Sequence, residues 1–153
     1  MSVETPKVPP SAQITFRVRL RTRWSDEDTQ HVLNNAVYST LFEEARFAYF
    51  SKLGLLEDNE FPFLLAQTSV LFLAPGRGGR EVEVEVATTH VGTTSCTQAY
   101  RVREVETGKV WCEAEARLVG FDPENQRKAP LSEAFRRSIE SVEGTSRDPT
   151  AAT

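Results

Sequence analysis

The stretch WSDEDTQHVLNNAVYSTLFEEARFAYFSKLG, residues 24–54, decides the fold of this 153-residue chain. Two carboxylates, Asp26 and Asp28, lie in a short polar loop, and Asn34 and Asn35 precede an apolar segment with helical spacing. The N-terminus of a helix presents unpaired backbone N–H groups and the positive end of the helix dipole. Because a carboxylate beside it offers a base or a nucleophile, this stretch predicts a place where a carbonyl group is polarised and attacked.

The apolar positions of this stretch predict one long helix from about Ala36 to Leu53, with Asn34 or Asn35 near its cap and Gly54 at its end. Large apolar side chains recur at intervals of three and four residues, so we expect other elements to wrap the helix. The stripe consists of Val37, Tyr38, Leu41, Phe42, Ala45, Ala48, Tyr49 and Leu53, widened by Phe47 and Phe50.

On both sides of the helix, the pattern changes to the period of two that is typical of strands. Residues 13–24 form the first strand, and we interpret its arginine-rich face as a solvated outer face rather than a ligand site. The strands expected after the helix cover about 66–74, 81–91, 94–105 and 110–121, and a short helix is expected at 131–142. Runs of strands without intervening helices predict an antiparallel sheet with the long helix packed on it. A single sheet covers only part of so apolar a helix, so we expect a homodimer or a homotetramer.

Length and composition predict one soluble, cytoplasmic domain at residues 13–142, between a flexible segment at 1–12 and a disordered tail at 143–153. The formal net charge of -4 argues against a nucleic-acid partner. No signal peptide and no stretch of membrane-spanning length is present, so no membrane insertion is expected. Cys96 and Cys112 lack the spacing of zinc ligands, so no metal is expected. A disulfide between them is the alternative to two buried thiols, which we favour.

The stretch resembles the signature of the 4-hydroxybenzoyl-CoA thioesterase-like family, which are acyl-CoA thioesterases of the hot-dog fold. An aromatic-x-D-x-D pattern matches residues 24–28, N-N-x-x-Y matches 34–38, and F-E-x-A-R matches 42–46. The likeness continues at residues 72–79, 91–95, 122–124 and 129–131. The resemblance implies an α+β hot-dog fold, in which a curved antiparallel sheet of about five strands wraps around one long central helix.

The resemblance also implies a site for hydrolysis of an acyl-CoA substrate without a cofactor. Asp28 matches the second acid of D-x-D and is the expected base or nucleophile, whereas Asp26 is expected to hold the loop. Backbone N–H groups at the helix start would polarise the carbonyl. The expected substrate contacts are His31, Asn34, Asn35, Tyr38, Thr93 and Ser95, with Arg77 and Arg80 at the phosphates of CoA.

The chain departs from the family pattern directly before the asparagine pair. The family usually has Gly-His-Val there, and this chain has His31, Val32 and Leu33. The imidazole has therefore moved one place along the loop, which leaves the job of the family's histidine open. Arg80 is a second departure, because many relatives carry an acid after the turn glycine.

Three alternatives accompany this interpretation. Glu43 or Glu44 on the helix is a rival base, as in a distinct branch of hot-dog thioesterases. A non-catalytic protein that binds acyl-CoA or an acyl carrier is an alternative function, which the displaced histidine favours. A hot-dog dehydratase or hydratase is disfavoured, because neither His31 nor His90 offers the required pattern of histidine with acid.

Overall fold

The computed structural model describes residues 4–56 and 58–143. The helices and strands follow in the order η1 (Ser11–Gln13), β1 (Phe16–Arg21), η2 (Trp24–Asp26), α1 (Asn35–Lys52), β2 (Phe63–Phe72), β3 (Glu81–Val91), β4 (Ser95–Glu104), β5 (Val110–Asp122), β6 (Arg127–Lys128) and α2 (Glu133–Glu143). None of the helices in these ranges has the length and hydropathy needed to cross a membrane.

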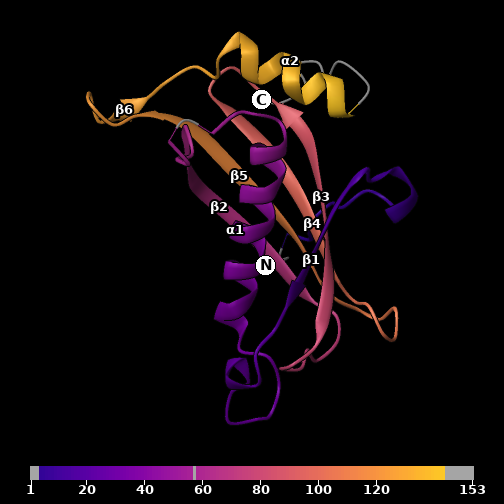
Figure 1. The fold of residues 1–153 in the computed structure, drawn as a ribbon. Helices are drawn as coiled ribbons and strands as arrows, with labels where there is room; N and C mark the ends of the chain where they lie inside the picture. Colours follow the sequence, from indigo (N-terminus) through magenta and orange to yellow (C-terminus); the bar gives the residue numbers. More distant parts are fainter. Residues whose placement is uncertain (1–3, 57, 144–153) are drawn as a thin grey trace.

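The strands form one antiparallel sheet in the order β1-β3-β4-β5-β2, and β6 adds a short pairing to β5. The sheet curves around α1, which crosses its concave face, while α2 lies across one end (Figure 1). The hot-dog arrangement expected from the resemblance is therefore confirmed. Strand β2 is at one edge of the sheet and β1 at the other.

Helix α1 begins and ends one residue earlier than predicted. Asn34 caps it, because its Oδ1 accepts the N–H of Ala36 at 2.9 Å, and Gly54 follows with a φ of 70°, in the left-handed region that ends many helices. The side chains buried against the sheet are Tyr38, Leu41, Phe42, Ala45, Arg46, Tyr49 and Phe50. Arg46 is the polar member of this face, and its Nε donates to the hydroxyl of Tyr100 at 2.9 Å.

Two details of the helical and strand patterns differ from expectation. Strand β2 starts at Phe63, three residues before the predicted start at Ala66. The prediction missed these residues because an irregularity between Leu65 and Gln67 interrupts the alternation of side chains. Phe47 is 39% exposed rather than part of the buried stripe.

The arginines of β1 face outward, but they are paired rather than simply solvated. In the antiparallel register, Arg17 lies opposite Glu85 and Arg19 opposite Glu83. Arg17 Nη1 is 3.3 Å from carboxylate oxygens of both Glu83 and Glu85. Glutamates that alternate with valine in β3 are thus the partners of Arg17 and Arg19, whereas Arg21 donates to the carbonyl of Gly79 at 3.2 Å.

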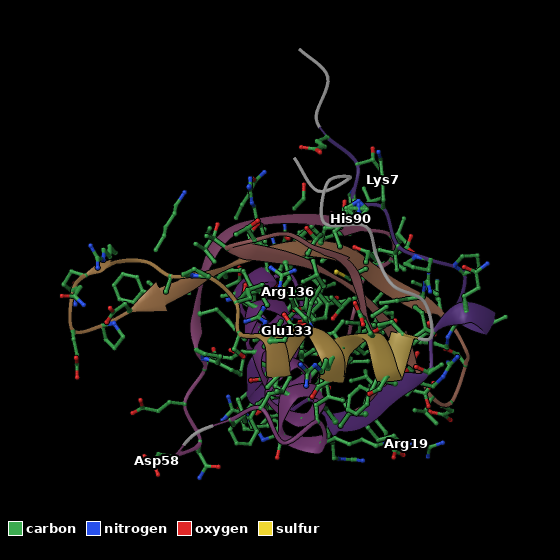
Figure 2. All side chains as sticks on the ribbon, turned by 90° about the horizontal axis from the view of Figure 1, so that it is seen from above. Lys7, Arg19, Asp58, His90, Glu133 and Arg136 are labelled. Carbon is green, nitrogen blue, oxygen red and sulfur yellow. The ribbon has the colours of Figure 1, made fainter. Side chains whose placement is uncertain are left out.

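The segment before β1 lies across this outer face. Ser11 Oγ donates to Glu85 at 2.9 Å, and Arg101 donates to the carbonyl of Pro9 at 3.0 Å. Figure 2 shows Lys7 and His90 on the outer side of the sheet, away from α1. The flexibility expected of residues 1–12 stays a prediction, and the expected tail beyond residue 143 lies outside the described residues.

The two cysteines are free and buried. Burial raises the pKa of both Cys96 and Cys112 to about 12. The interpretation of the pair as buried thiols is therefore confirmed, and the alternative disulfide is absent.

Candidate functional site

The candidate site is the loop between β1 and α1, which packs on the connection from β2 to β3. Leu33 donates its N–H to the carbonyl of Gly76 at 2.9 Å, and Asn34 donates to the carbonyl of Asp26 at 2.9 Å. Glu27 and Leu33 pair in an isolated β-bridge. These hydrogen bonds fold the loop back on itself directly before the first turn of α1.

Asp28 lies in the tight turn at the tip of this loop. Its N–H donates to Val32 at 2.9 Å, and its carbonyl accepts from the N–H of His31 at 3.0 Å. Its Oδ1 accepts the N–H of Gln30 at 2.8 Å, while Oδ2 accepts no hydrogen bond from the described residues. The half-buried carboxylate is therefore fixed through one oxygen and has the other available to accept a proton.

The backbone of His31 has a φ of 61°, the left-handed region that favours glycine. The family's usual residue at this place is glycine, so the structure accounts for that preference. The side chain of His31 is exposed, and its charge contributes to a lowered pKa of Glu27, after the larger effects of Gly78 and Arg77. The displaced imidazole is carried by the same turn as Asp28, because the N–H of His31 donates to the carbonyl of Asp28.

The start of α1 provides a donor beside this turn. The side chain of Asn34 accepts the N–H of Ala36, and its carbonyl accepts the N–H of Val37 at 2.9 Å. The N–H of Asn35 is one of the donors that a helix leaves without an intrahelical partner, and it has no acceptor among the described residues. The N–H of Asn35 is therefore available to a group outside the described chain.

A hollow of about 410 Å³ opens next to the helix start. It is lined by Gln30, Val32, Leu33, Asn35, Tyr38 and residues 72–76. Tyr38 packs edge-on against Phe72, with ring centroids 5.2 Å apart, and burial raises the pKa of Tyr38 to about 12. Tyr38 therefore contributes a neutral hydroxyl to the lining of this hollow.

Asp26 and Asp28 have different surroundings, as expected. Asp26 is buried and accepts the N–H of Arg23 at 2.8 Å and the guanidinium of Arg23 at 2.8 and 3.1 Å. Burial alone would raise the pKa of Asp26, but the hydrogen bonds and charge of Arg23 hold it below its usual value. Asp26 is therefore committed to holding the loop.

Two further predicted residues lie far from Asp28 in the same chain. Thr93 and Ser95 are at the turn between β3 and β4, beneath α2 at the opposite end of the sheet (Figure 1). There, Leu131 donates to the carbonyl of Thr93 at 2.9 Å, and Arg136 of α2 donates to the carbonyls of Gly92 and Thr93. One protomer alone does not bring Thr93 and Ser95 to the loop.

The predicted phosphate contacts already have acidic partners. Arg77 donates its Nε to Glu27 at 3.0 Å, and Arg80 lies 3.4 Å from Glu106. Both arginines remain partly exposed. The contacts of Glu27 with Arg77 and Gly78 were not predicted, although the glycine-rich turn at residues 75–80 was a signal that another backbone approaches there.

Glu43 and Glu44, the rival candidates for the catalytic base, and the expected absence of a metal site complete the comparison with the sequence predictions. Glu43 and Glu44 are exposed on α1 and do not line the hollow. In the described part of the chain, no group of three or more His, Cys, Asp or Glu side chains is suited to hold a metal ion. Of the acids considered, Asp28 is the nearest in sequence to Asn35, whose N–H is the unpaired donor at the start of α1.

Comparison with known proteins identifies the family. Residues 22–139 match the model of the thioesterase-like superfamily, and no curated protein matches the chain. A thioesterase from Thermus thermophilus, whose structure is complexed with coenzyme A and Zn, is 34% identical. It has a TM-score of 0.74, and the match covers 84% of this chain and 95% of that one.

Two other solved structures share the fold at lower identity. A 1,4-dihydroxy-2-naphthoyl-CoA thioesterase from Synechocystis is 20% identical with a TM-score of 0.75, over 84% of this chain and 97% of that one. A thioesterase superfamily protein from Jannaschia is 20% identical with a TM-score of 0.79, over 91% of this chain and 89% of that one.

Proposed function

The chain belongs to the thioesterase-like superfamily, and on this premise we propose that it hydrolyses acyl-CoA thioesters to a free acid and CoA. The observation that carries the proposal is Asp28, which has one free carboxylate oxygen beside the start of α1. The adjacent hollow of about 410 Å³ offers apolar walls to the acyl group. The complex of the Thermus thermophilus relative with coenzyme A supports CoA as the leaving group.

In the proposed reaction, Asp28 acts on the thioester carbonyl in one of two ways. As a general base, its Oδ2 takes a proton from water while the water oxygen bonds to the carbonyl carbon. As a nucleophile, Oδ2 bonds to that carbon and forms an anhydride, which water then hydrolyses. In both routes the N–H of Asn35 stabilises the oxyanion, and the C–S bond breaks to release the thiolate of CoA.

We also propose that the site is completed in a homodimer through the free edge of β2. Leu64, Leu65, Leu71, Phe72 and Leu73 at this edge are 37–53% exposed, and an apolar edge strand is a template for another strand. An antiparallel pairing of two β2 strands about a twofold axis brings the α2 end of one copy toward the Asp28 end of the other. This arrangement supports contacts of Thr93 and Ser95 with the pantetheine arm.

The proposed binding roles of the remaining residues follow from this arrangement. His31 and Asn34 border the turn and the helix start, where the reacting carbonyl would lie. Arg77 has two terminal guanidinium nitrogens without hydrogen bonds among the described residues, and these suit a CoA phosphate. Arg80 would have to leave Glu106 to contribute in the same way.

The displaced histidine favours a second candidate, a non-catalytic protein that binds acyl-CoA or an acyl carrier. One experiment separates the two: incubation with a panel of acyl-CoA thioesters while free thiol is followed. We expect the wild type to release thiol, and Asp28→Asn to lower kcat by at least about a hundredfold with little change in KM, because the amide neither accepts the proton nor attacks.

Three controls make this result specific. Asp26→Asn should lower stability more than turnover, because Asp26 is bonded to Arg23. Glu43→Gln and Glu44→Gln should keep substantial activity. Near-normal kcat in Asp28→Asn together with an inactive glutamate variant would assign the chemistry to α1, and binding without thiol release by the wild type would favour the second candidate.

A further inference from the structure

Glu27, the residue between the two aspartates, joins the Asp28 loop to the β2–β3 connection. Its Oε2 accepts the N–H of Gly78 at 2.8 Å and the Nε–H of Arg77 at 3.0 Å. The side chain is only 20% exposed, so these hydrogen bonds are partly shielded from water. The N–H of Gly78 and then Arg77 lower the pKa of Glu27, which keeps its carboxylate ionised at neutral pH.

The backbone at Glu27 determines where Asp28 points. Glu27 is extended, with φ of -77° and ψ of 144°, and successive side chains of an extended segment face opposite sides. Because Glu27 faces the β2–β3 connection, Asp28 faces away from it. Anchoring one side chain therefore sets the direction of the other.

The loop is held to the same connection a second time, after the turn. Leu33 donates its N–H to Gly76 at 2.9 Å and pairs with Glu27 in the β-bridge. The two hydrogen-bonded points, at Gly78 and Gly76, enclose the turn that carries Asp28. A loop fixed at both ends in this way has little freedom to move its tip.

The loop that carries Asp28 approaches the β2–β3 connection closely. A Cβ atom placed on Gly78 would collide with the backbone of Arg23 and Trp24. The hydrogen bond from Gly78 to Glu27 therefore lies where the two backbones are packed together, and this packing fixes the distance between the loop and the connection.

From these contacts we infer that Glu27 is a positioning residue for the reaction, which holds the Asp28 carboxylate at the start of α1 without touching the substrate. The inference rests on the proposed thioesterase function. A catalytic group displaced by about 1 Å can lose about a hundredfold in rate, so a hydrogen bond that fixes its loop affects turnover more than binding.

The test compares Glu27→Ala, Glu27→Gln and the control Glu81→Ala in steady-state kinetics. We expect Glu27→Ala to lower kcat about ten- to a hundredfold and to change KM by less than about twofold. The amide oxygen of Glu27→Gln still accepts the N–H of Gly78, so this variant should recover most of the lost kcat. Glu81 pairs with Arg19 at 3.5 Å on the outer face, and its replacement should leave kcat unchanged.

A second measurement keeps the inference independent of catalysis. Amide hydrogen exchange over residues 28–33 should be faster in Glu27→Ala than in the wild type and near normal in Glu27→Gln. Wild-type kcat in Glu27→Ala, or a fall in kcat that Glu27→Gln does not reverse, overturns the inference. If the wild type cleaves no thioester, the proposed function fails, and unchanged exchange in Glu27→Ala then separately overturns the role of Glu27.

Discussion

At the residue scale, His31 is where backbone conformation and side-chain chemistry conflict. Its φ of 61° places a residue with a Cβ in a region that costs about 1–2 kcal/mol relative to the right-handed region. Strain of this kind persists where the surrounding hydrogen bonds impose it, and it is frequent at functional sites. Here the imposing bonds are those of the Asp28 turn, to which the N–H of His31 belongs.

We predict that His31→Gly stabilises the protein. Relief of about 1–2 kcal/mol of strain exceeds the backbone-entropy cost of glycine, about 0.5–1 kcal/mol, so the free energy of unfolding should rise by up to about 1.5 kcal/mol. Urea denaturation measures the change. Thr29→Gly in the same turn, where φ is not positive, should be destabilising instead. A loss of stability in His31→Gly would mean that the imidazole makes a contact worth more than the strain.

At the element scale, strands β1, β3, β4 and β5 carry alternating charge on the outer face of the sheet. Glu85 of β3 has no exposed surface and lies within 3.0–3.3 Å of guanidinium nitrogens of Arg17, Arg101 and Arg103. Removing one member of a buried ion pair leaves an uncompensated charge, which is far more costly than breaking an exposed pair. Glu85 therefore joins β1 and β4 to β3 on this face, and its hydrogen bond from Ser11 joins the N-terminal segment to them.

We predict that Glu85→Gln lowers the free energy of unfolding by about 3 kcal/mol or more. The matched control is Glu81→Gln on the same strand, whose pair with Arg19 is largely exposed and whose loss should cost less than about 0.5 kcal/mol. Chemical denaturation of both variants checks the contrast. Equal, small losses would show that water or a rearranged arginine replaces the buried pairs.

The elements themselves were largely predictable, because each follows from a local period. The predicted helix from Ala36 to Leu53 differs from α1 by only one residue at each end, because capping by Asn34 is a local signal. The start of β2 was missed, because the irregularity between Leu65 and Gln67 breaks the alternation. The arginine–glutamate pairing was missed as well, since it depends on which distant strands become neighbours.

The candidate site was predictable only where its residues are close in sequence. The Asp28 turn and the cap at Asn34 lie in one stretch, whose resemblance to a family identified them. The hydrogen bond from Gly78 to Glu27 joins positions 51 residues apart, and no local pattern predicts such a contact. Residues that depend on a second protomer, as proposed for Thr93 and Ser95, are likewise beyond local reasoning.

At the scale of the whole molecule, the free edge of β2 is the feature that one protomer leaves incomplete. Its backbone groups have no strand partner on one side among the described residues, and its large apolar side chains remain exposed. Natural edge strands usually avoid this combination, because it invites another strand. The hollow at the start of α1 ends at the same strand, since Phe72 lines it.

We predict that the double variant Leu64→Lys/Leu71→Lys is a monomer at micromolar concentration and loses thioesterase activity with its dimer. Lysines on this edge place like charges across the proposed twofold axis. Light scattering measures the mass. Trp24→Lys, which replaces an 83% exposed side chain outside β2, should keep the mass of the wild type. A double variant with wild-type mass would move the interface elsewhere.

The buried state of Cys96 and Cys112 has a practical consequence for how this protein is studied. Thiolates, not thiols, react with colorimetric disulfide reagents, and with both pKa values near 12 almost no thiolate exists at neutral pH. The folded protein should therefore give almost no background colour when released CoA is titrated. Gradual colour development without substrate would instead report unfolding, so one reagent serves as both activity probe and folding probe.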